Sequence, residues 1–172
     1  FDGTHYYVAD VGNNFGTKDT LNIYKIPAAQ VGLPGFLETA GVISFSYDEP
    51  VSRNDRGLYS HDCEALFVYN DSLYLFAKDW VKYETRVYVL PIVPGHYNVK
   101  SKVSYPVNAL ITGADINRSN KEVVLVGYRR KIPVVIRFGF NNDPALISCG
   151  GKARCYLRFA GTQMEGIVYD PL

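Results

Sequence analysis

The sequence predicts an all-β fold, and more closely a β-propeller built from four-stranded antiparallel blades. Short runs rich in β-branched and aromatic residues alternate with segments of Gly, Pro, Asn and Asp. The best helical window, residues 28–40, is interrupted by two glycines and a proline. Glu64, Asp115 and Glu165 each precede an apolar run, at intervals of 51 and 50 residues. A period near fifty is the length of one four-stranded blade with its loops.

Strands are expected wherever an apolar or aromatic run is bounded by turn residues. Polar turns at 70–71 and 117–122 join neighbouring strands into hairpins, which we take as the innermost two strands of each blade, strands a and b. The strands expected on this basis cover residues 4–11, 20–27, 41–47, 64–70, 72–79, 85–92, 122–128, 133–140 and 154–161.

The repeats divide the chain into a single partial propeller domain, residues 1–172. Blade A covers about 1–50, blade B about 62–107, blade C about 110–160, and blade D starts at about 163–172. The first blade lacks a strand a and the last has only that strand, so about three blades and a fraction are expected. The remaining blades are then expected from the same or another chain.

A long polar loop interrupts the repeat between blades A and B. Tyr7, Tyr74 and Val124 occupy matching places in strand b, at intervals of 67 and 50 residues. The surplus of about seventeen residues falls in the segment 48–61, and a long excursion of this kind favours a functional loop.

Charge and cysteine content limit the partners and the compartment. The formal net charge is +1 and the only basic run is 129–131, so nucleic acid and an anionic membrane are disfavoured as partners. Cys149 and Cys155 bracket a flexible loop that allows a disulfide, while Cys63 has no local partner; the alternative is three reduced thiols in a cytosolic protein. Asn70 and Asn117 begin glycosylation sequons on the hairpin turns. We predict a secreted or cell-surface location.

The acidic residues that begin each innermost strand should meet at one end of the blades. Strand a begins where the antiparallel strand b ends, and the a strands of a propeller line its central channel. Glu64, Asp115 and Glu165 should therefore ring one mouth of the channel. The residues expected around them, as ligand-binding candidates, are Asp10, Asn13, Asn14, Lys78, Asp79, Trp80, Tyr128 and Arg129.

Three converging carboxylates require compensation, because like charges repel one another more strongly when buried. Ca²⁺ is the cation predicted at Glu64, Asp115 and Glu165, since it takes six to eight oxygen ligands. Lys78 or Arg129 could neutralise the carboxylates instead. A third interpretation is that each carboxylate accepts hydrogen bonds from backbone amides of the next blade, without any ligand.

Four motifs resemble a family of secreted bacterial propeller proteins. They are "DVGNN" from residue 10, "HDCEALFVYNDSLYLFAKDW" from residue 61, "ITGADINRSNKEVVLVGY" from residue 111 and "QMEGI" from residue 163. The resemblance implies a six-bladed ring and an extracellular setting. The chain is more distantly similar to calcium-dependent six-bladed hydrolases of the gluconolactonase and paraoxonase type and to esterase-like phytases. That likeness implies calcium held by Glu64 or Glu165 with Asp115, although no central Asn begins a strand.

Catalytic residues are less well indicated than binding residues. Ser60, His61 and Asp62 are adjacent, and adjacent side chains of an extended chain point to opposite faces, so we expect no triad. His61 remains a weak candidate for a general base, or an exposed loop histidine. No Cys/His spacing fits zinc. Trp80 and Tyr128 lie among polar neighbours, where they could stack on a sugar, grip a peptide or cover a blade interface.

Two functions follow from these patterns. The first is a non-catalytic extracellular module for binding, adhesion or assembly, with a carbohydrate or protein ligand and a calcium-stabilised channel mouth. The second is a calcium-dependent hydrolase of a lactone, phosphoester or sugar phosphate. The first is preferred, because no complete catalytic set can be named.

Overall fold

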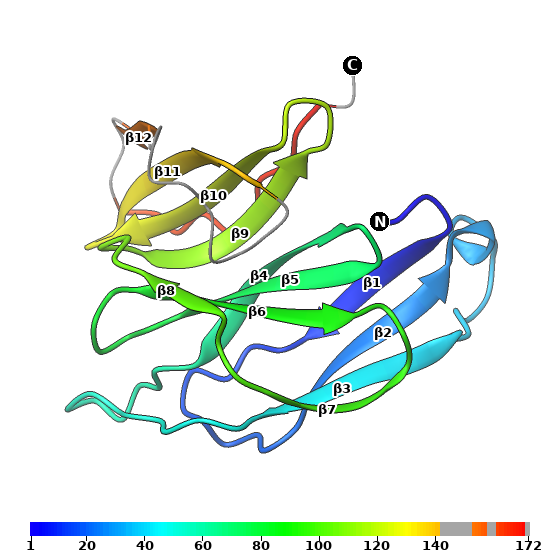
Figure 1. Cartoon of the computed structure of the whole chain (residues 1–172), viewed down its shortest axis with the longest axis horizontal. Helices are drawn as coiled ribbons and strands as arrows, with labels where there is room; N and C mark the ends of the chain where they lie inside the picture. Colours follow the sequence, from blue (N-terminus) through cyan, green and yellow to red (C-terminus); the bar gives the residue numbers. More distant parts are fainter. Residues whose placement is uncertain (142–152, 158–160, 171–172) are drawn as a thin grey trace.

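The fold is all-β, as the sequence predicts. A computed structural model describes residues 1–141, 153–157 and 161–170, and its strands form three four-stranded sheets (Figure 1). Sheet 1 contains β1 (His5–Asp10), β2 (Leu21–Pro27), β3 (Gly41–Tyr47) and β7 (Gly95–Val99). Sheet 2 contains β4 (Asp62–Tyr69), β5 (Ser72–Lys78), β6 (Thr85–Pro91) and β8 (Val103–Tyr105). Sheet 3 contains β9 (Leu110–Asn117), β10 (Glu122–Arg129), β11 (Ile132–Gly139) and β12 (Ala153–Tyr156).

Helical structure is limited to one short turn in the described residues. The segment 28–40, which the sequence analysis excluded as a helix, contains only the 3-10 turn η1 (Ala28–Gln30). No helix in the described ranges is both long and apolar enough to span a membrane.

Strand pairing follows the predicted hairpins, with one exception at the outer edge of sheet 1. β4 pairs with β5 and β9 with β10, both antiparallel, across the turns proposed from the sequence. β7 lies between β6 and β8 in the chain, yet it pairs in parallel with β3. The chain therefore leaves sheet 2 to complete sheet 1, and returns to add β8 at the edge of sheet 2.

Sheet 2 lies between the other two sheets and is buried on both faces. Val68, Leu73 and Leu75 belong to a buried cluster that includes Ile23 and Phe45 of sheet 1. The alternate residues of the same strands form a second cluster with sheet 3; its aromatic members are Phe67, Tyr69, Tyr74, Phe76, Tyr105, Phe138 and Phe140. This period-two division of β4 and β5 is what strands buried on both faces require.

β4 and β9, the first strands of sheets 2 and 3, carry equivalent bulges near their beginnings. In β4, Cys63 pairs with Ala77 and Ala65 with Phe76, so that Glu64 has no partner across the ladder. In β9 the unpaired residue is Thr112, between the pairs made by Ile111 and Gly113. A bulge commonly redirects a side chain at the edge of a site, and here the bulge of β4 presents Glu64.

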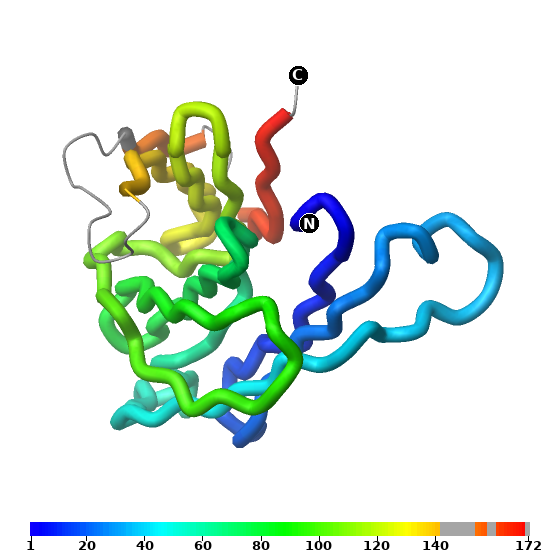
Figure 2. Tube along the Cα trace, turned by 45° about the vertical axis from the view of Figure 1, so that its right-hand side comes forward, coloured from blue at the N-terminus to red at the C-terminus, as the bar shows by residue number. Residues whose placement is uncertain are grey.

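The C-terminal segment 162–170 runs beside β9 without forming a strand. The Tyr169 amide donates to Asp115 Oδ2 at 2.7 Å, and the Thr112 hydroxyl donates to the Met164 carbonyl. A Cβ on Gly113 would lie 3.0 Å from Gly166 Cα, so the two backbones approach closely there. Figure 2 shows this segment, in red, next to the blue N-terminus.

Candidate functional site

A cavity of about 300 Å³ lies where loops of sheet 1 meet strand ends of sheets 2 and 3. The β1–β2 loop, the β3–β4 loop and the C-terminal segment complete its walls. We call it the Trp80 cavity, and it is lined by Asn14, Phe15, Leu58, Glu64, Lys78, Trp80, Tyr128, Gln163 and Glu165. Six of these nine were predicted from the sequence: Asn14, Glu64, Lys78, Trp80, Tyr128 and Glu165.

Trp80 is held in place by polar contacts on its backbone and on its indole ring. Its Nε1 donates to Asp62 Oδ2 at 2.9 Å, its backbone amide donates to the Tyr59 carbonyl at 3.4 Å, and its carbonyl accepts from Asn54 Nδ2 at 3.4 Å. The indole therefore has a fixed orientation before any ligand arrives, which lowers the entropic cost of binding to it.

A buried ion cluster forms the floor of the Trp80 cavity. Lys78 Nζ lies 2.6 Å from Glu64 Oε2 and 3.4 Å from Asp62 Oδ2, and the Lys78 side chain is 3% exposed. Asp62 is fully buried and also accepts a hydrogen bond from the Asn13 amide at 2.7 Å. Of the three interpretations made from the sequence, direct neutralisation by Lys78 is the one that this geometry displays for Glu64.

Negative charge nevertheless accumulates at the mouth of the cavity. Burial raises the pKa of Glu64 above its ordinary value, and the carboxylates of Asp62 and Glu165 raise it further against the effect of Lys78. Burial, followed by Glu64 and Glu165, raises the pKa of Tyr128 to about 12. Tyr128 thus stays a phenol that can donate a hydrogen bond, and Gln163 Nε2 lies 3.3 Å from its oxygen.

A second cavity, of about 290 Å³, adjoins the first at Trp80 and Leu58, which line both. We call it the Tyr83 cavity. Its other walls are Asn54, Asp55, Arg56 and Tyr83, from the β3–β4 and β5–β6 loops. The long polar loop that the sequence analysis marked as functional therefore forms part of both cavities.

Four predicted ligand-binding residues lie outside both cavities. Asp79 is fully buried: its Oδ1 accepts from the amides of Val81 and Lys82, and its Oδ2 lies 2.9 Å from Arg86. The buried Asn13 side chain forms hydrogen bonds with the Thr17 amide and the Lys18 carbonyl. The exposed Asp10 forms an ion pair with Lys18 at 2.5 Å. The Arg129 guanidinium lies 3.5 Å from the centre of the Tyr83 ring.

Asp115 does not share a cavity with Glu64 and Glu165. Its pairing partner in β10 is Val124, and the matching pair in sheet 2 is Phe67 with Tyr74, so Asp115 corresponds to Phe67. The residue equivalent to Glu64 is Thr112. The β4–β5 loop has two residues and the β9–β10 loop has four, so equivalent residues are closer in sequence between β4 and β9 than between β5 and β10. A constant period of about fifty residues therefore does not identify the residue of β9 that corresponds to Glu64.

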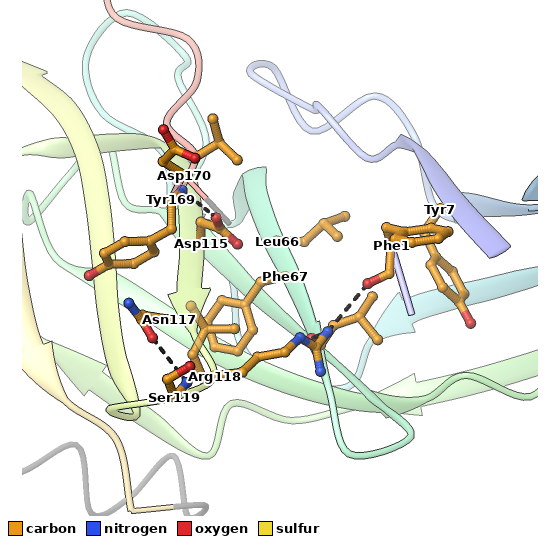
Figure 3. Close-up of a pocket in the computed structure, with 13 residues that line it drawn as sticks. Phe1, Tyr7, Leu66, Phe67, Asp115, Asn117, Arg118, Ser119, Tyr169 and Asp170 are labelled. Atoms are coloured by element: carbon orange, nitrogen blue, oxygen red, sulfur yellow. Dashed lines mark hydrogen bonds between the residues drawn. The ribbon is translucent and has the colours of Figure 1, made fainter. Parts of the chain in front are cut away.

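Asp115 instead lines another cavity, of about 560 Å³, between β1, β4, β9 and the C-terminal segment (Figure 3). Arg118 crosses it to donate to the carbonyls of Val68, at 2.7 Å, and Phe1, at 3.3 Å. Asp115 holds the Tyr169 amide, so its carboxylate fastens the adjacent segment, as the third interpretation expected of these acids.

His61 is fully buried, contrary to the expectation of an exposed or channel-facing histidine. Ser60 Oγ lies 2.7 Å from its Nδ1, and Glu49 Oε1 lies 3.3 Å from its Nε2. Burial, followed by Arg86, lowers the pKa of His61. The three side chains thus have the order of a Ser-His-Glu triad, contrary to expectation, but Ser60 is 0% exposed and accepts from the Ser52 amide at 2.9 Å. The arrangement is a polar network beneath the loops.

The cysteines and sequons predicted to indicate secretion are only partly described. Cys149 lies outside the described residues; within them, Cys63 is buried, Cys155 is exposed and no disulfide is formed. Asn70 is exposed on the two-residue β4–β5 loop, and Asn117 ends β9 with its Oδ1 accepting from the Ser119 amide at 3.0 Å.

Oxygen ligands for a cation are present at the Trp80 cavity, but the predicted set of three is not assembled. Within the described residues, no three His, Cys, Asp or Glu side chains are grouped closely enough to hold a metal ion. Glu64 and Glu165 line this cavity and Asp115 lines another, and calcium binding by these three carboxylates stays a prediction.

Comparison of the chain with protein-family models, with curated proteins and with solved structures gives no match.

Proposed function

We propose that this chain is part of a β-propeller and acts as a non-catalytic extracellular binding module whose ligand occupies the Trp80 cavity. The stacking of sheet 2 between sheets 1 and 3, with β4 next to β9, supports the blade arrangement. The exposed sequon at Asn70 supports the extracellular setting.

One observation carries the binding function: side chains from strands of sheets 2 and 3, from loops next to sheet 1 and from the C-terminal segment converge on one cavity with a preorganised indole. Concave sites that combine aromatic walls with a few oriented polar groups are typical of ligand pockets. Exposed Phe15 and half-buried Trp80 supply apolar surface, while Gln163, Glu165 and Glu64 supply amide and carboxylate groups. Such a set recognises a ligand without needing a nucleophile.

The binding function is tested by calorimetric titration with saccharides, short peptides and Ca²⁺. Trp80 is the single tryptophan of the chain and lines both this cavity and the Tyr83 cavity, so tryptophan fluorescence reports a ligand bound in either of them. Binding that changes this fluorescence and is lost in Trp80→Ala supports the proposal. Binding that Trp80→Ala leaves unchanged places the ligand elsewhere and overturns it. Lys82→Ala, at an exposed residue outside both cavities, is the matched control.

Calcium-dependent hydrolysis is a second candidate, favoured by the presence of Glu64 and Glu165 in one cavity; burial raises the pKa of Glu64, and the Asp62 and Glu165 carboxylates add to this effect. Paired carboxylates can serve in acid and base catalysis, or bind a cation that polarises a scissile group. An esterase and lactonase screen distinguishes the two functions. Turnover that disappears with a chelator and in Glu64→Gln would replace the binding function with this one.

A further inference from the structure

The Trp80 and Tyr83 cavities adjoin each other, because they share two lining residues. Trp80 and Leu58 line both, while Lys78, 5.0 Å above the indole ring, lines only the first. Each cavity is at or below the small end of the range for ligand pockets, so a single compact ligand would fill one and leave the other empty. A chain of similar units would fill both.

The chemistry of the walls favours sugar rings as those units. Arg129 covers one face of the Tyr83 ring and Lys78 lies over the indole of Trp80, so it is the rest of each ring that offers apolar surface against which the C–H face of a pyranose can pack. Hydroxyl groups both donate and accept, and the walls supply acceptors in Glu165 and Asp55 and donors in Arg56 and Gln163. A peptide that binds by adding a strand to a sheet would instead need a free sheet edge. The walls of these cavities consist of loops and strand ends.

The charge of the first cavity excludes acidic sugars from it. Glu64, Glu165 and Asp62 bring three carboxylates against the single ammonium of Lys78. A uronate, sulfate or phosphate there would add another negative charge close to these groups.

We propose that the ligand is an uncharged oligosaccharide of at least two units, bound across Trp80 with one unit in each cavity. This inference rests on the binding function proposed above and names the class of its ligand. The second unit would contact Asp55 and Arg56, both exposed, whose charged groups have no hydrogen bond or ion pair within the described part of the chain.

Chain length is the variable that tests this proposal. Oligomers of glucose, xylose and N-acetylglucosamine with one to four units are titrated by calorimetry and by Trp80 fluorescence, with oligogalacturonides as the acidic comparison. For the preferred sugar, affinity is expected to rise about tenfold from one unit to two, and little beyond three. The double variant Asp55→Ala/Arg56→Ala should return the affinity for the dimer to that for the monomer, and Lys82→Ala should not.

Three outcomes would overturn the inference. Equal affinity for monomer and dimer would mean that the Tyr83 cavity is not used, which overturns the inference. In that case, monosaccharide binding that still depends on Trp80 would leave the proposed binding function intact. Preference for oligogalacturonides contradicts the charge argument. If no saccharide binds but a peptide binds in a Trp80-dependent way, the proposed ligand class is wrong and the binding function stands. If no ligand binds at Trp80, the proposed binding function is wrong as well.

Discussion

Lys78 Nζ lies 2.6 Å from Glu64 Oε2 and 3.4 Å from Asp62 Oδ2, so one buried ammonium compensates two carboxylates that come from the same strand. The bulge in β4 makes this possible, because Glu64 occupies the unpaired position. The cluster joins the core to the cavity: Asp62 also holds the indole of Trp80. Its integrity should therefore affect both stability and binding.

Lys78→Met should lower the free energy of unfolding by about 3–5 kcal/mol, because it leaves the fully buried Asp62 carboxylate without a cation. Chemical denaturation at neutral pH measures this loss. The matched control Lys82→Met, at an exposed position, should stay within about 0.5 kcal/mol of the parent. A Lys78→Met protein as stable as the parent would mean that Asp62 is protonated or hydrated.

His61 should make stability depend on pH just below neutrality. Its folded-state pKa is lowered from 6.5, so the unfolded chain binds the proton more tightly. Stability should therefore be fully present above pH 6.5 and should fall as pH decreases from 6.5 towards the lowered pKa. The lowered pKa of Glu49 acts in the same direction at more acidic pH, below 4.5.

Urea denaturation of the parent and of His61→Gln between pH 5 and 8 tests this dependence. The variant should lose the slope below pH 6.5 whatever its absolute stability, whereas His96→Gln, at an exposed position, should retain it. Identical slopes in the parent and His61→Gln would show that His61 titrates equally in both states.

Gly113→Ala should displace the C-terminal segment from β9. An added Cβ would lie 2.9 Å from Val126 Cγ1, 3.0 Å from Gly166 Cα and 3.2 Å from Ile167 N, and the two backbone atoms can move away only together with the segment that carries them. The Tyr169 amide, which donates to Asp115, should then exchange its hydrogen faster. Hydrogen exchange measures this effect, and Gly12→Ala, with no atom within 4 Å of the new Cβ, is the control.

The same substitution should weaken ligand binding, because Gln163 and Glu165 reach the Trp80 cavity from this segment. Unchanged affinity together with faster exchange at Tyr169 would show that these two residues contribute little to recognition.

Phe76→Ala should destabilise the protein by about 3–5 kcal/mol, since it opens a void in the cluster between sheets 2 and 3. Phe76 is 0% exposed, and its ring centroid lies 5.7 Å from that of Phe67. Phe15→Ala, at a residue that is 60% exposed, is the control and should change stability by about 0.5 kcal/mol or less. A small effect of Phe76→Ala would indicate that the two sheets close together over the void.

The sequence predicts the strands of this protein well because burial in β-structure is periodic and local. β4 and β5 alternate between two cores, and the turn between them contains Asn70 and Asp71, which adopt positive φ. β7 and the three-residue β8 were not predicted, and the strand expected at about 163–172 is not formed by residues 162–170. The partner of β7, β3, lies some fifty residues away, and most residues of β7 are exposed, so no local pattern distinguishes it.

The residues of the candidate site that lie at the ends of strands were predicted from the sequence. Several residues that loops bring to the site were missed. Glu64, Lys78 and Trp80 follow from the hairpin geometry of β4 and β5. Asp115 was misplaced because two hairpins with loops of different length do not keep a constant period. Ser60 and His61 meet because they precede β4, so the alternation of extended chain does not apply to them. Phe15, Leu58 and Gln163 carried one usable signal, their proximity in sequence to predicted site residues.

β7 has a consequence for how such a protein can evolve. Because it is encoded between β6 and β8 but completes the neighbouring sheet, no contiguous stretch of gene specifies sheet 1 or sheet 2 alone. Duplication or loss of the segment that encodes one sheet would leave a β-strand of the neighbouring sheet without its pairing partner. Growth by copying one sheet at a time is therefore obstructed at this boundary, and sheets 1 and 2 are inherited as a pair.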